Sequence, residues 1–148
     1  MVNHLALEPL LIARIKAAVP GFRAVLGMAD LASMQEAGQT TPAAHVIYQG
    51  DAYPPGAGSS TRLVEQTWLV VVAVRNVRDT VGGSAAREEA GVLISQVLTA
   101  LSGWRCAPEE KPLTLVTPPR PGFNAGYAYF PLAFKFSFFA KGVSCESN

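Results

Sequence analysis

The apolar positions of this chain repeat with a period of two in some stretches and with a period close to 3.6 in others. The clearest stretch with period two is residues 63–76, LVEQTWLVVVAVRN, which alternates in its first half and is almost wholly apolar in its second half. Successive side chains of a strand point to opposite faces of the sheet. The pattern therefore predicts a long strand that is exposed on one face where it begins and covered on both faces where it ends.

The stretch that follows predicts a turn and then an amphipathic helix. Residues 77–84, VRDTVGGS, are polar and glycine-rich, and residues 85–104 carry apolar residues at steps of three and four. Ser84 is placed to cap this helix, and Gly103 is a natural end for it. Gly91, in the middle, would allow the helix to approach the sheet closely. The apolar stripe that would cover the sheet consists of Ala86, Ala90, Leu93, Val97, Leu101 and Trp104.

Another helix is predicted near the amino terminus. It should begin at Glu8-Pro9, because proline suits the first helical position, and Leu7 should pack onto Ile12 from just outside the helix. Residues 22–38 are less regular: RAVLG predicts a short extended piece, and DLASMQEA predicts a short helix capped by Asp30. The apolar face of the first helix consists of Leu11, Ile12, Ile15 and Val19.

Three more strands are predicted, at residues 43–50, 111–117 and 127–139. The proline, glycine and serine residues of 51–61 predict a mobile surface loop. Pro131 lies within the last strand and cannot donate a hydrogen bond to a neighbour, so this strand should be at an edge or bulged there. Its core-facing residues should be Phe130, Leu132, Phe134, Phe136 and Phe138.

These elements predict an α+β fold in one domain. The order is α-β-β-α-β-β, and the simplest arrangement is a two-layer sandwich in which two main helices cover a mostly antiparallel four-stranded sheet. A length of 148 residues fits a single domain spanning 1–148, with a core at about 7–139 and flexible termini.

The amino-acid composition indicates that part of the protein surface is apolar. Of all residues, 49% are hydrophobic and only 16% are charged. A surface buried against other copies of the chain would produce this composition, and so would a monomer rich in alanine and valine. Self-association is the favoured interpretation.

Charge and hydropathy exclude two classes of partner. The net charge is +1 and the 12 basic residues are dispersed, whereas a nucleic-acid-binding protein carries them in a stripe. The longest apolar run, residues 69–74, is far shorter than the roughly 20 residues that a membrane helix needs. The first ten residues lack the pattern of a secretory signal, and two cysteines, Cys106 and Cys145, make no disulfide framework.

No group of residues predicts catalysis, a metal site or a cofactor. His4 lies in the expected flexible terminus, and His45 lies within a strand with no carboxylate or cysteine near it in sequence. The Gly82-Gly83-Ser84 sequence lacks the lysine of a phosphate-binding loop and the full GxGxxG spacing. We therefore expect a protein that is not an enzyme. The alternative is a hydrolase that uses Cys106 or His45.

One surface is a candidate for protein contacts. Tyr127, Tyr129 and Lys135 should lie on the outward face of the last strand. An outward aromatic and cationic surface is found both in ordinary solvated sheets and in contact faces, so both interpretations stay open.

Five segments in this order carry a resemblance to known proteins: EPLLIARIKAAVPGF, TPAAHVIYQG, LVEQTWLVVVAVRNVRD, GGSAAREEAGVLISQVLTALSGW and PLTLVTPPRPGFNAGYAYFPLAFKFSF. In them the chain resembles the tail-terminator and related minor tail proteins of tailed bacteriophages and prophages. The resemblance covers residues 7–139 and is weakest at residues 21–39.

The resemblance implies an α/β domain that assembles into a ring, typically of six copies. Such a ring caps the tail tube, stops its polymerisation and presents a surface to the head connector. The implied partners are other copies, the tail tube protein and head–tail connector proteins, first in the cytoplasm of the bacterial host and then in the virion tail. No cofactor and no catalysis are implied.

Two choices remain open from the sequence. Within the resemblance, a terminator and a neck or connector protein are alternatives. Outside it, the alternative is a small-ligand or peptide-binding module of the bacterial cytoplasm that uses a sheet face or an edge strand. The candidate contact residues at strand ends or outward positions are Arg75, Arg78, Arg120, Tyr129 and Lys135.

Overall fold

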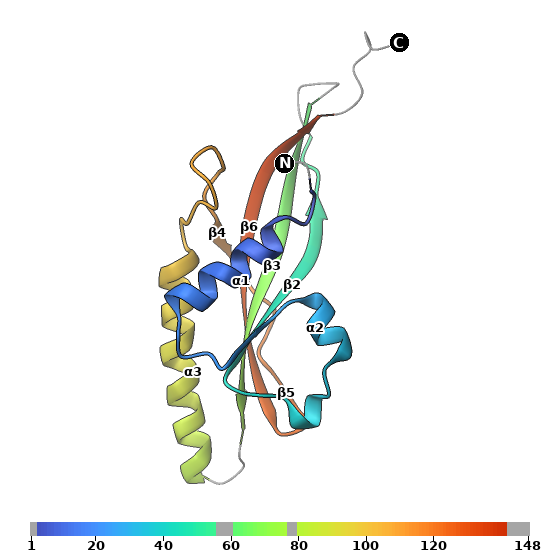
Figure 1. The fold of residues 1–148 in the computed structure, drawn as a ribbon. Coiled ribbons are helices and arrows are strands. Elements are labelled where there is room, and N and C mark those ends of the chain that lie inside the picture. The colour runs from blue at the N-terminus through green and yellow to red at the C-terminus, as the bar shows by residue number, and fades with distance from the viewer. Residues whose placement is uncertain (1–2, 56–60, 77–79, 142–148) are drawn as a thin grey trace.

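A computed structural model describes residues 3–55, 61–76 and 80–141, without the side chains of residues 80–85 and 141. Within these ranges the chain is α+β, as expected (Figure 1). The helices are α1 (Leu7–Ala18), α2 (Met28–Ser33) and α3 (Thr80–Leu101), with a 3-10 turn, η1 (Glu36–Gly38). The strands are β1 (Ala24–Leu26), β2 (Ala43–Ala52), β3 (Thr61–Arg75), β4 (Thr114–Val116), β5 (Gly122–Asn124) and β6 (Tyr127–Lys141).

The sheet is larger than predicted and is not purely antiparallel. It has six strands in the order β1-β2-β3-β6-β4, with β5 also paired to β6. The β1–β2 pair is parallel and the other pairs are antiparallel. The four-stranded prediction was wrong because β1 and β5 are three residues each, too short for an alternating pattern to be recognised.

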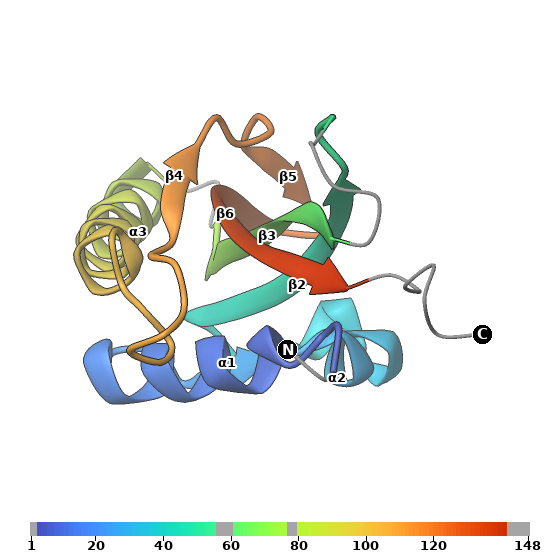
Figure 2. The same cartoon turned by 90° about the horizontal axis from the view of Figure 1, so that it is seen from above.

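The long antiparallel ladder between β3 and β6 organises the core. It runs from Thr61 paired with Lys141 to Arg75 paired with Tyr127 without a shift in register. Paired residues share a face of the sheet, so the even-numbered residues of both strands lie together. Helices α1 and α3 cover this face (Figure 2), which confirms that two helices cover one side. The largest fully buried side chains include Trp68, Phe134, Phe136, Leu7, Leu11, Ile15 and Leu101.

The prediction for the long strand is confirmed residue by residue. Val64, Gln66, Trp68, Val70, Val72 and Val74 are all buried beneath the helices. On the opposite face, Leu63 through Leu69 are only partly buried, whereas Val71 and Ala73 are buried. Strand β3 is therefore covered on one face where it begins and on both faces where it ends.

Two predictions about α3 were wrong. The helix begins at Thr80, so Gly82, Gly83 and Ser84 are helical and Ser84 is not its cap; residues 77–79 of the expected turn lie outside the described ranges. A glycine inside a helix costs about 1 kcal/mol, and a helix that packs on a sheet tolerates that cost. Gly91 is exposed, and a Cβ built on it would meet nothing within 4 Å, so it makes no close approach to the sheet.

The amino-terminal helices differ from prediction at their first turns. Helix α1 begins at Leu7, which is fully buried as part of the helix instead of packing from outside it. The cap of α2 is Gly27, and Asp30 is the third helical residue; its carboxylate accepts a hydrogen bond from the Gly27 N–H at 3.1 Å. The extended piece expected before α2 is confirmed as β1.

Pro131 lies in β6 at a position between the part of the strand that pairs with β5 and the part that pairs with β4. Strand β6 lies between β3 and the two short strands, so it is not an edge strand, and its register with β3 has no bulge. However, β5 pairs with β6 up to Tyr129 and β4 pairs with it from Ala133. At residue 131, therefore, neither short strand pairs with β6, and a residue without a backbone N–H is tolerated.

Both ends of the expected mobile loop at residues 51–61 belong to strands. Asp51 and Ala52 belong to β2 and Thr61 belongs to β3, while residues 56–60 lie outside the described ranges. A shift of register between Tyr48 and Gly50 lets β2 continue beyond its predicted end. This shift brings Asp51 opposite Gln66, on the face that the helices cover.

Candidate assembly surface

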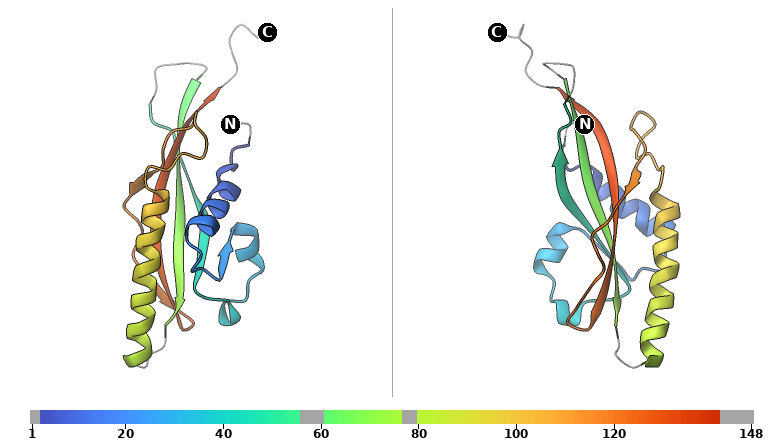
Figure 3. Two further views of the ribbon diagram at one scale, coloured as in Figure 1. Left: turned by 60° about the vertical axis from the view of Figure 1, so that its left-hand side comes forward. Right: turned by 180° about the vertical axis from the view of Figure 1, so that it is seen from behind.

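Much of the sheet face opposite α1 and α3 lacks a covering helix. Seen from behind (Figure 3, right), β2, β3 and β6 present this face between α2 on one side and α3 on the other. We call its partly exposed portion the open sheet face. It consists of Ile47, Leu63, Glu65, Thr67, Leu69, Val116, Pro131, Lys135, Ser137 and Phe139.

The open sheet face is mainly apolar with one ion pair within it. The Lys135 Nζ lies 3.6 Å from the Glu65 carboxylate, and both side chains are partly exposed. At its upper end the Phe139 side chain is 56% exposed, and the Lys111 ammonium lies 4.6 Å from its ring centroid. Apolar area interrupted by a few charges is typical of protein contact surfaces.

Three of the five predicted contact residues lie on the same side of the sheet. The register of β3 with β6 places Arg75, Tyr129 and Lys135 on the face away from α1 and α3. Arg75 is exposed at the end of β3, and Arg120 is exposed in the segment between β4 and β5. Arg78 lies outside the described ranges.

Tyr129 is covered in part by the 3-10 turn. Its hydroxyl donates to the Glu36 carboxylate at 2.5 Å and accepts from the Gln39 side-chain amide at 2.8 Å. Glu36 also accepts from the Asn124 side chain at 2.8 Å, and the Tyr127 hydroxyl donates to the Ala37 carbonyl at 3.2 Å. Burial and the hydrogen bond to Glu36 raise the pKa of Tyr129 to about 12. These bonds hold residues 36–39 over the lower end of the face.

His45 lies beneath this network as a buried residue. Its side chain is on the same face as Tyr129, with ring centroids 6.0 Å apart, and its Nε2 has no hydrogen-bond partner within the described residues. Burial lowers the pKa of His45, and the nearby Glu36 carboxylate opposes this effect. The environment fits a neutral structural histidine, as the sequence indicated.

A second polar cluster lies at the opposite end of the sheet, and no pattern in the sequence predicted it. The Asp51 carboxylate accepts hydrogen bonds from the hydroxyls of Tyr48 and Tyr53 and lies 2.6 Å from the His4 Nε2. The buried Gln66 donates to the His4 carbonyl and accepts from the Trp68 indole at 3.0 Å. His4 was expected in a flexible terminus, and in the structure these contacts tie it to β2 and β3.

The groups considered for catalysis are not brought together. The charged groups that act on Cys106 are Glu109 and Glu110, whereas Glu36 and Tyr129 lie near His45. Burial raises the pKa of the Cys106 thiol, which disfavours the nucleophilic thiolate. No three His, Cys, Asp or Glu side chains within the described ranges are grouped to hold a metal ion. Among the same residues, no helix has the length and apolar character to cross a membrane.

Comparison with known proteins decides the family. A sequence profile of the phage tail terminator protein family matches residues 1–143. The chain belongs to the phage tail terminator family. The resemblance found in the sequence is thereby confirmed, and the family is one of structural virion proteins.

A solved structure has a similar fold. A chain in the virion of a native gene transfer agent particle superposes with a TM-score of 0.50 at 13% sequence identity, over 93% of the present chain and 89% of that chain. At this identity the similarity concerns the fold alone. No curated protein sequence matches the chain.

Proposed function

We propose that this terminator-family protein assembles into a closed ring, of six copies as the family resemblance implies. The ring would cap the tail tube, stop its growth and join it to the head connector. It would assemble in the cytoplasm of the bacterial host and remain in the virion tail. Arg75, Arg78, Arg120, Tyr129 and Lys135 stay candidates for contacts with other copies or with the tail.

The open sheet face is the observation that carries this proposal. A ring subunit uses two different surfaces, because each contact in a cyclic assembly is head to tail. Helices α1 and α3 lie on one side of the sheet and the open sheet face lies on the other. The two sides of the sheet therefore present different surfaces, and this difference supports head-to-tail contacts between copies.

Light scattering and electron microscopy of the purified protein test the ring. We expect a concentration-dependent closed oligomer. Leu69→Asp, on the open sheet face, should weaken assembly by about tenfold or more, roughly 1.4 kcal/mol per contact. The matched control is Ala29→Asp, at an exposed position of α2 that belongs to neither of these two surfaces, and it should assemble as the parent does.

Two results would contradict the proposal. One is a strict monomer at high concentration that forms no ring even when tail tube is added. The other is full assembly of Leu69→Asp with unchanged affinity. A monomer that bound a peptide or small ligand at the sheet would instead support the alternative of a cytoplasmic binding module.

A further inference from the structure

Residues 117–126, which connect β4 to β6 and include β5, are all exposed. We call them the β4–β6 connection. Their sequence is TPPRPGFNAG, in which Arg120 is the only charged residue. Phe123 is 66% exposed, which makes it the most exposed of the large apolar side chains that the structure describes. An aromatic and an arginine side chain on one exposed segment is the composition that protein contact sites favour.

The β4–β6 connection is restrained although it is exposed. Its three prolines each fix a backbone φ angle, and β5 pairs with the first three residues of β6. Ala125 and Gly126, with φ of 52° and 83°, form the two-residue turn between β5 and β6. The Asn124 side chain donates to the Glu36 carboxylate at 2.8 Å. An aromatic side chain on a restrained backbone loses little conformational entropy when it binds a partner.

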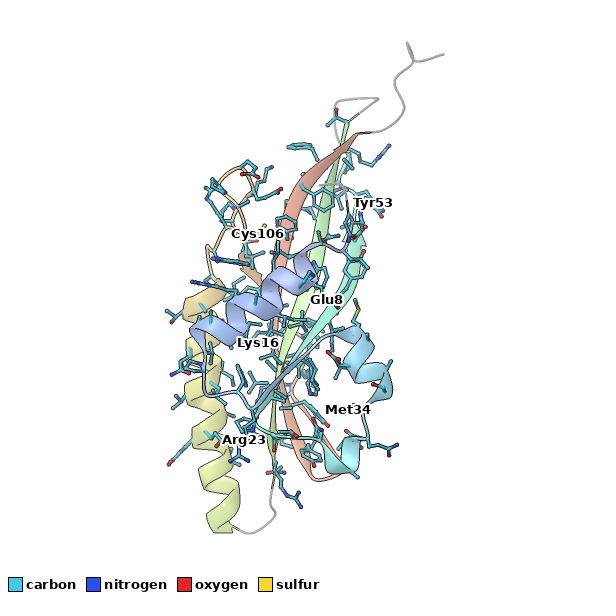
Figure 4. The ribbon with its side chains drawn as sticks, in the orientation of Figure 1. Glu8, Lys16, Arg23, Met34, Tyr53 and Cys106 are labelled. Carbon is cyan, nitrogen blue, oxygen red and sulfur yellow. The ribbon has the colours of Figure 1, made fainter. Side chains whose placement is uncertain are left out.

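The β4–β6 connection lies at one end of the long strands and outside the open sheet face. Strand β5 pairs with β6 where β6 begins, next to the end of β3 (Figure 1). Tyr53, another exposed aromatic residue, lies toward the opposite end of the sheet (Figure 4), and its hydroxyl donates to Asp51 at 2.8 Å. Contacts between copies on the two sides of the sheet would leave the ends of the strands free. A different protein can therefore contact Phe123.

The side chains of the β4–β6 connection define the chemistry of this partner. Phe123 requires an apolar pocket, and Arg120 favours carboxylates at the rim of that pocket. No Asp or Glu occurs in the sequence between Lys111 and Lys141, so this part of the chain has only positive charges. In the proposed function the ring meets the open end of the tail tube. That end exposes the surface that the next layer of tube protein would bury, so we expect it to offer unfilled apolar pockets.

We propose that the β4–β6 connection docks onto the open end of the tail tube, with Phe123 in an apolar pocket and Arg120 against a carboxylate at the rim. The inference rests on the proposed ring and assigns its contact with the tube. Each copy in the ring contributes one such contact. Because the copies are linked, their contacts reinforce one another, and a weak contact per copy is enough to hold the ring on the tube.

Binding of the whole chain to purified tail tubes tests the proposal. Phe123→Ser removes an exposed side chain, so the fold and the ring should be retained. We expect its binding to tube ends, measured by cosedimentation, to weaken by about tenfold or more, and tubes should continue to elongate in its presence. The matched control is Leu115→Ser, because Leu115 is also apolar and is 52% exposed but lies in β4, outside the β4–β6 connection. It should bind and cap as the parent does.

The role of Arg120 is tested by charge and by salt. Arg120→Glu should weaken binding to the tube more than Arg120→Gln does, because a carboxylate at the rim would repel the new charge. Added salt should weaken the binding of the parent more than the binding of Arg120→Gln. Light scattering should show the same ring for all these variants. Equal binding by the parent and both Arg120 variants would overturn the assignment of a carboxylate to the partner.

The remaining outcomes are distinguishable. If the parent forms no ring, the proposed function fails. If the parent forms a ring and Phe123→Ser caps tubes as well as the parent, the ring stands and the β4–β6 connection is not the tube contact. If Phe123→Ser loses the ring itself, the connection is a contact between copies, and if it loses only binding to the head connector, the partner is the connector. Either of these two results overturns the assignment to the tube.

Discussion

At the scale of single residues, polar groups fix the two ends of the sheet. The cluster around Asp51 ties the amino-terminal segment to β2 and β3, and the cluster around Tyr129 ties residues 36–39 to β6. In each cluster a carboxylate accepts hydrogen bonds from neighbouring side chains. Their role in the subunit is to hold loops against the sheet.

His45 should make stability depend on pH near neutrality. Burial depresses its folded-state pKa below 6.5, so its contribution to stability is complete above pH 6.5 and decreases as the pH falls toward the folded-state pKa. Urea unfolding midpoints measured from pH 8 to pH 5 should fall for the parent and fall less for His45→Met.

His4 provides the control for that measurement, because it is the other histidine of the chain. His4→Gln should retain the His45-dependent fall in stability. Equal pH profiles for the parent and His45→Met would show that charging this imidazole does not oppose folding.

At the scale of elements, the two long strands and the long helix determine the architecture. Strands β3 and β6 are 15 residues each and pair along their full length, and α3 lays its apolar stripe across them. The short strands complete the sheet around this unit. Gly91 lies in the middle of α3 and is exposed, and a side chain there would contact no neighbour. A substitution at this position can therefore raise the stability of the helix without disturbing the core.

Gly91→Ala should stabilise the subunit by about 0.8–1 kcal/mol, because alanine loses less backbone entropy in a helix and its Cβ meets no neighbour within 4 Å. Urea denaturation of dilute protein measures this gain. Gly103→Ala is the contrasting variant, since Gly103 has a φ of +76° and alanine is strained there. A loss of stability in Gly91→Ala would mean that a glycine is required at this position.

At the scale of the whole molecule, the subunit is asymmetric, with helices on one side and much of the opposite sheet face uncovered by a helix (Figure 3). An apolar face of this kind is stable in water when another protein covers it. The Glu65–Lys135 pair within it fixes a charge pattern that a neighbouring copy would have to match.

Exchanging these two charges tests whether a neighbouring copy contacts Glu65 and Lys135 with complementary charges. The double variant Glu65→Lys with Lys135→Glu keeps an ion pair within the subunit, so its free energy of unfolding should change by less than about 1 kcal/mol. Its assembly should nonetheless weaken by about tenfold, as measured by light scattering, because the charges presented to the neighbour are reversed. Unchanged assembly would place the contact elsewhere.

The sequence by itself determined the elements whose patterns are long. Alternation over β3 and β6 and the stripe of α3 predicted most of the buried side chains, because many residues report the same periodicity. Phe130, Ala86 and Trp104 are only partly buried, and Tyr127, which was expected on the outward face, is buried. A strand of three residues is too short to show a period. The sequence therefore predicted β1 only as a short extended piece, and it did not predict β5. Helix ends were also misplaced, since glycines favour a turn locally and only packing decides whether a helix continues through them.

Only the tertiary structure decided what lies against what. It brought Glu36 and Gln39 over Tyr129, His4 onto Asp51, and Pro131 into the gap between β5 and β4, in each case through contacts between residues distant in sequence. Such contacts leave no local pattern, because hydrogen-bond partners are set by strand order and register. The open sheet face likewise follows from where the helices pack, a property of the assembled fold and of no single segment.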